Sequence, residues 1–78
     1  MSTTPQDFRN TLLAQDSEFQ RLAAEHSRCD GQLEALQNQT FLSSEDLILE
    51  VTLKKVKLRL KDQMEQLLVR RYRELGLP

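Results

Sequence analysis

The stretch LKKVKLRLKDQM, residues 53–64, decides the fold that this sequence predicts. An apolar residue recurs in it at steps of three or four: Leu53, Val56, Leu60 and Met64. That spacing marks one face of an α-helix. Basic side chains fill the same turns: Lys54, Lys55, Lys57, Arg59 and Lys61. The stretch therefore predicts a helix that packs through its apolar face, and its lysines either bind a partner or only flank that face.

Signals for the two ends of this helix lie well outside the stretch. Ser43 can serve as the N-cap, with Asp46 three residues later as in a capping box. Gly76 can end the helix in a left-handed conformation, and Pro78 lies beyond it. We therefore expect a helical arm over about 44–75.

A second set of signals predicts an earlier arm over about 5–38. Thr4 and Pro5 suit the N-cap and first helical positions. From Phe8 to Leu36, positions on one helical face recur every three or four residues, and most of them are apolar. Asp16 and Ser17 could cap a new helix and break this arm near residue 15. The unbroken register argues against a large break and leaves a kink open.

The two arms match in length and are joined by a turn at about 39–43, which predicts an antiparallel helical hairpin, coiled-coil-like, over the whole chain 1–78. Folding about residue 41 sets Leu33 near Leu49 and Phe8 near Tyr72. The fold class is therefore all-α.

The apolar face of the second arm is wider than one neighbour can cover, because three residues lie off its main stripe: Ile48, Val51 and Leu58. A face of this width implies a second copy of the chain. We predict a homo-oligomer, favouring a dimer that forms a four-helix bundle.

Composition narrows the class of protein. The chain has 78 residues, 38% hydrophobic and 29% charged, and a net charge of −1. Its single cysteine, Cys29, has no partner for an internal disulfide. The N-terminus lacks the pattern of a signal peptide, and no run approaches the roughly 20 apolar residues of a membrane span. We expect a cytoplasmic protein that uses no cofactor or metal.

The basic side chains of the second arm are the main candidate for a binding surface: Lys54, Lys55, Lys57, Arg59, Lys61, Arg70, Arg71 and Arg73. Lysines that flank an apolar stripe commonly pair with acids on the neighbouring helix, here Glu25, Asp30 and Glu34. Because the chain is net acidic and its one tyrosine lies elsewhere, this packing role is preferred. The alternative is a surface for nucleic acid or another polyanion.

Other candidate sites have simpler structural explanations. His26 and Asp30 lie one helical turn apart and can pair, but a metal site needs more ligands, so we interpret them as a polar pair at the seam. Glu45 and Asp46 are acids at a helix start, where capping accounts for them. Gly31 either admits a second helix or is tolerated on the surface, and Cys29 is expected to be buried. No nucleophile, phosphate loop or ligand set predicts an enzyme.

Two strings resemble the YdcH-like family of small bacterial proteins: FQRLAAEHSRCDGQLEALQ (19–37) and LKKVKLRLKDQM (53–64). With the turn between them, the resemblance covers roughly residues 17–68. Cys29 stands where that family usually has leucine, and the ends of the chain match nothing in the family. The resemblance implies a self-associating α-helical hairpin in the bacterial cytoplasm, and it carries no biochemical role. The sequence therefore predicts a protein–protein interaction module.

Overall fold

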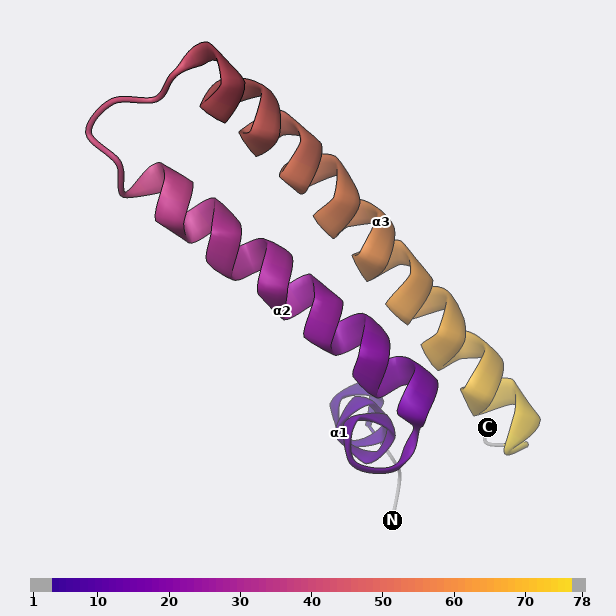
Figure 1. The fold of residues 1–78 in the computed structure, drawn as a ribbon. Coiled ribbons are helices and arrows are strands. Elements are labelled where there is room, and N and C mark those ends of the chain that lie inside the picture. The colour runs from indigo at the N-terminus through magenta and orange to yellow at the C-terminus, as the bar shows by residue number, and fades with distance from the viewer. Residues whose placement is uncertain (1–3, 77–78) are drawn as a thin grey trace.

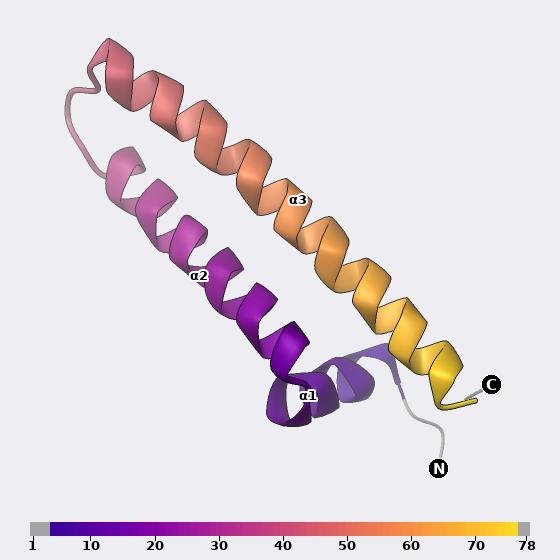
Figure 2. The same cartoon turned by 45° about the vertical axis from the view of Figure 1, so that its right-hand side comes forward.

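The computed structural model describes residues 4–76, and they form three α-helices: α1 (Pro5–Gln15), α2 (Ser17–Gln37) and α3 (Ser44–Glu74). The all-α prediction is confirmed. Figures 1 and 2 show α2 and α3 side by side and running in opposite directions, with α1 lying across their open end. The molecule is a rod with extents of 51 × 19 × 17 Å.

The capping predictions for α1 and α3 are confirmed. The Thr4 hydroxyl accepts a hydrogen bond from the Asp7 backbone N–H at 3.0 Å, and the Ser43 hydroxyl accepts one from the Asp46 N–H at 3.0 Å. The aspartate side chains accept bonds back from the cap N–H groups, which completes both capping boxes. Each cap satisfies donors that the first helical turn leaves without partners.

Gly76 follows the end of α3 with a φ of 67°, in the left-handed region that favours glycine. Its N–H donates to the Arg73 carbonyl at 3.0 Å. The predicted glycine stop is therefore confirmed, and Pro78 lies outside the described residues.

The first arm is two helices, where the apolar register predicted one. Asp16 has an extended backbone (φ −100°, ψ 112°), which stops the helical path after Gln15. Its carboxylate accepts a hydrogen bond from the Phe19 N–H at 2.9 Å and caps α2. The apolar register crosses this break because both helices turn their apolar faces to the same core. Periodicity alone therefore cannot reveal the break.

The core consists of two clusters along the rod. The larger lies where all three helices meet and contains Phe8, Leu12, Phe19, Leu22, Leu60, Leu67 and Leu68. The Phe8 and Tyr72 rings pack edge to face with centroids 5.4 Å apart, which confirms that predicted contact. The smaller cluster, near the loop, contains Leu33, Leu36 and Leu53. Cys29 is half-buried against both clusters.

The register of α2 against α3 differs from the prediction by more than one helical turn of α3. Asp30 pairs with Lys57, and Asp16 pairs with Arg71, so the midpoint of both pairs lies between residues 43 and 44 and not at 41. Leu33 accordingly packs with Leu53, and Leu49 is exposed. The loop carries the chain past the end of α2 before Ser43 caps α3 (Figure 1). The first turns of α3 therefore project beyond α2.

Gly31 lies inside α2, and a Cβ placed on it meets no atom within 4 Å. Because alanine is the better helix former, Gly31→Ala should raise the free energy of unfolding by about 0.5–1 kcal/mol. Chemical denaturation of the two proteins measures this difference. An unchanged or lowered stability would mean that another helix packs closely on Gly31, the role that the sequence left open.

Candidate interaction surfaces

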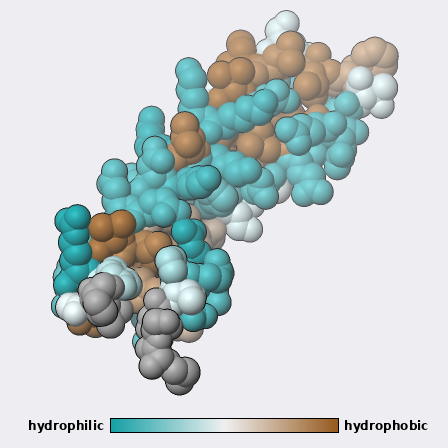
Figure 3. All heavy atoms as spheres, turned by 180° about the vertical axis from the view of Figure 1, so that it is seen from behind, coloured by the Kyte–Doolittle hydropathy of each residue, from teal (hydrophilic) through white to brown (hydrophobic). Residues whose placement is uncertain are grey.

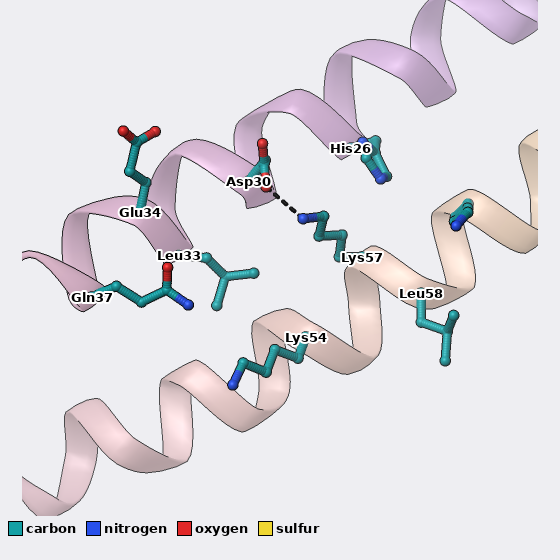
Figure 4. A pocket seen from close by; sticks show the side chains of 9 residues that line it. His26, Asp30, Leu33, Glu34, Gln37, Lys54, Lys57 and Leu58 are labelled. Carbon is teal, nitrogen blue, oxygen red and sulfur yellow. Dashed lines mark hydrogen bonds and ion pairs between the residues drawn. The ribbon is translucent and has the colours of Figure 1, made fainter.

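A groove of about 470 Å³ runs between α2 and α3 on one side of the rod. Charged and polar side chains form most of its walls, as Figure 4 shows. His26, Asp30, Glu34 and Gln37 come from α2, with Leu33 between them; Lys54, Lys57, Leu58 and Lys61 come from α3. The groove therefore brings together three of the candidate basic residues with His26 and Asp30.

One ion pair crosses the groove. Asp30 and Lys57 point toward one another (Figure 4), and the Lys57 Nζ donates to Asp30 Oδ1. This hydrogen bond and the charge of Lys57 lower the pKa of the Asp30 carboxyl, with a smaller contribution from His26. The lysine stem crosses the contact between the two helices while its ammonium group stays near water. The pair therefore joins the two helices but contributes little to the stability of the fold.

The other groove lysines do not pair across the helices. Lys54 pairs with Glu50 on its own helix at 3.3 Å. Within residues 4–76, Lys61 and the two expected acids Glu25 and Glu34 form no ion pair. Of the predicted pairs between lysines and the first arm, the structure therefore contains the one with Asp30.

Two arginines near the end of α3, Arg70 and Arg71, lie against acidic side chains. Arg71 donates to Asp16 at 2.9 Å, to Glu18 at 3.2 Å and to Glu74 at 3.0 Å. Its bond to Glu74, followed by that to Asp16, raises the pKa of the Arg71 guanidinium above its usual value. Arg70 lies 3.7 Å from Glu18. These contacts tie α3 to the junction of α1 and α2.

Three further basic side chains remain: Lys55, Arg59 and Arg73. All are exposed, and in the part of the chain that the structure describes they form no ion pair. Lys55 and Arg59 lie on the side of α3 away from the groove, and Arg73 lies near its end. The eight candidate basic residues are therefore divided between a groove wall, a cluster paired with acids and the outer side of α3, and they do not form one patch.

An exposed apolar surface on α3 contains Ile48, Val51 and Leu58, the three residues that the sequence placed off the main apolar stripe. We call Ile48, Val51, Leu58 and Val69 the outer stripe. They lie toward the side of α3 turned away from α2, and Leu58 also borders the groove. Ile48 is 67% exposed and Leu58 is 60% exposed. In the loop, Phe41 is 86% exposed. Figure 3 shows hydrophobic side chains gathered over the loop end of the rod.

The signal for this surface was partly visible in the sequence. Ile48, Val51 and Leu58 stand off the main apolar stripe, as noted above. The exposure of Leu47 and Leu49 depends on the register of α2 against α3, which no local pattern encodes. Val69 was missed because it directly follows Leu67 and Leu68, and in the sequence either of these leucines continues the main apolar stripe.

The described residues contain no helix that is long and apolar enough to cross a membrane. They also contain no group of three or more side chains of the His, Cys, Asp and Glu types placed to hold a metal ion. No protein-family model matches the chain, and neither a curated protein nor a solved structure is significantly similar to it.

Proposed function

We propose that this chain is a self-associating helical module that binds other proteins, and that two copies join their hairpins into a dimer of four long helices. The observation that carries the proposal is the outer stripe together with the exposed apolar residues at the loop end. Exposed apolar side chains that gather on one part of a protein surface commonly mark a site of protein–protein interaction. We also propose that the chain belongs with the YdcH-like proteins that it resembles and that it acts in the bacterial cytoplasm.

The size of the core also supports a partner chain. The core clusters lie between α2 and α3 and beneath α1, and among residues 4–76 no other element covers the outer side of α3. A chain of this length buries too little apolar surface to be robustly stable alone. Covering the outer stripe with a second helical surface would add buried area without changing the protomer.

A binding module also fits the chemistry of the groove better than an enzyme does. Catalytic acids, bases and nucleophiles commonly have pKa values that are shifted by a pocket that excludes water. The groove is open and its walls are charged, and Asp30 is held in its charged form by Lys57. Such a lining offers ion pairing to a partner.

Self-association is tested by light scattering or sedimentation equilibrium over roughly 1–100 µM protein, a range that spans the affinities of ordinary dimers. We expect the mass to rise to twice the 9.1 kDa of the chain. The same run with Leu58→Lys, which puts a charge in the outer stripe, should shift the transition to higher concentration. A mass that stays at 9.1 kDa throughout would contradict the proposal.

A second candidate function, binding of a polyanion, is favoured by one observation. Lys55, Arg59 and Lys61 have no ion pair within the described range 4–76, so their charges are available to a ligand. Binding to DNA or RNA through them would weaken steeply with salt. The chain as a whole has a net charge of −1, whereas proteins that bind nucleic acid are commonly basic. We therefore rank this function below the first.

A further inference from the structure

Two complementary apolar features lie at opposite ends of the outer side of α3. Near the loop, Ile48 projects from the helix. Near the other end, an apolar hollow of about 260 Å³ is lined by Pro5, Phe8, Leu68, Val69, Tyr72 and Arg73. Ile48 and Val69 are separated by 21 residues of helix, roughly 32 Å at 1.5 Å per residue. One protomer therefore cannot bring its own Ile48 to its own hollow.

The residues between these ends follow a seven-residue repeat: Ile48, Lys55, Asp62 and Val69. A step of seven is two helical turns, so the four lie along one line of the helix. The order is apolar, basic, acidic, apolar. When a second copy of the line is reversed, apolar residues meet apolar residues and opposite charges meet.

We propose that two copies pair antiparallel through the outer sides of their α3 helices. In this pairing Ile48 of each copy occupies the hollow beside Val69 and Tyr72 of the other, and Lys55 faces Asp62 of the other. Leu58 meets Leu58 of the second copy near the two-fold axis. This pairing rests on the proposed self-association and specifies its surface.

The charges select the antiparallel direction. Lys55 and Asp62 are both exposed, and within the described residues neither makes an ion pair. They lie about 10 Å apart along the helix, too far to pair with each other. A parallel dimer would place Lys55 against Lys55 and Asp62 against Asp62, and like charges facing each other oppose association. The antiparallel dimer forms two equivalent opposite pairs, as an isologous interface requires.

Charge reversal tests this pairing. We expect Lys55→Glu and Asp62→Lys each to raise the dissociation constant of the dimer by at least about tenfold, because like charges then face each other. The double variant should return it to within about twofold of the wild type, since the two sites exchange signs. Sedimentation equilibrium measures all four proteins, and circular dichroism checks that each retains its helices.

The outcomes separate this inference from the proposed function. A wild-type protein that stays monomeric overturns both. A wild-type dimer whose double variant is as weak as the single variants overturns the antiparallel pairing and leaves self-association standing. Recovery in the double variant supports the pairing, because no contact within one protomer joins Lys55 to Asp62.

Cysteine cross-linking gives a second readout that does not depend on charge. In a Cys29→Ser background, Leu58→Cys should form a disulfide-linked dimer on oxidation, because a disulfide needs Cα atoms within about 7 Å. Ile48→Cys, far from the axis, should not link to itself. Ala24→Cys, on the exposed back of α2, is the control for random collision. Linkage of Ile48→Cys as readily as Leu58→Cys would show a parallel pairing and overturn the inference.

Discussion

Replacing Phe19 with alanine should lower the free energy of unfolding by about 3–5 kcal/mol, because a large buried ring is lost and a cavity remains. Phe19 is fully buried and is part of the cluster that joins all three helices. A domain of this size commonly has only roughly 5 kcal/mol of stability in total. We therefore expect most Phe19→Ala molecules to be unfolded or only partly helical at 25 °C, as measured by circular dichroism and urea denaturation.

The chain offers a matched control for this substitution. Phe41→Ala makes the same chemical change in the loop, where the ring is almost fully exposed. Its effect on the unfolding free energy should stay within about 0.5 kcal/mol. Both variants should be compared at one protein concentration, since self-association would add to the apparent stability. Equal losses in the two variants would mean that the three-helix junction is not the centre of the core.

Replacing Asp16 with alanine should cost about 2 kcal/mol, the second-largest effect that we expect. Its carboxylate caps α2 through the Phe19 N–H and accepts a hydrogen bond from Arg71 at 2.9 Å. The Asp16 side chain is only 15% exposed, so water replaces these contacts poorly. Urea denaturation measures the loss, and amide exchange at Phe19 should quicken locally.

Asp16→Asn separates the two roles of this side chain. Asparagine is as good an N-cap as aspartate, but it offers Arg71 no charge. We expect Asp16→Asn to lose less stability than Asp16→Ala, and the difference between them reports the cap. If the two variants are equally unstable, the ion pair with Arg71 and not the cap holds the junction of α1 and α2.

The same side chain makes stability depend on acid. The hydrogen bond from the Phe19 N–H, aided by Arg71 and opposed by partial burial, lowers the pKa of the Asp16 carboxyl below its ordinary value of 3.8. A carboxyl with a lowered folded pKa stabilises the fold above the unfolded value, and this contribution is lost as the pH falls through the folded pKa. Stability measured from pH 6 downward should therefore fall less below pH 3.8 in Asp16→Asn than in the wild type. The pair of Asp30 with Lys57 is exposed, so Asp30→Asn should change the loss of stability at acid pH less than Asp16→Asn does.

Local patterns predicted the parts of this fold that depend on neighbouring residues. The capping boxes at Thr4 and Ser43 and the glycine stop at Gly76 are each made within one turn of chain. The apolar positions of α3 were likewise readable, because the helical repeat sets which side chains share a face. These features need no information from elsewhere in the molecule.

Other features depend on how the helices meet. Asp16 had the signature of a cap, yet the apolar register continued through it, so the sequence supported both a break and a straight arm. The break brings α1 across the open end of α2 and α3, where Phe8 and Leu12 complete the larger cluster. That gain in packing is an interaction between helices, and a one-dimensional pattern does not contain it.

By itself, the sequence determined that the chain is helical, where α1 and α3 begin, and which residues of α3 are apolar. The tertiary structure decided the break at Asp16, the register of α2 against α3 and the exposure of Leu47 and Leu49. The physical reason is the distance along the chain over which each interaction acts. Hydrogen bonds in caps and side-chain spacing on a helix act over a few residues. Register is chosen by the packing of whole faces, as in the packing of Leu33 with Leu53 that leaves Leu49 uncovered.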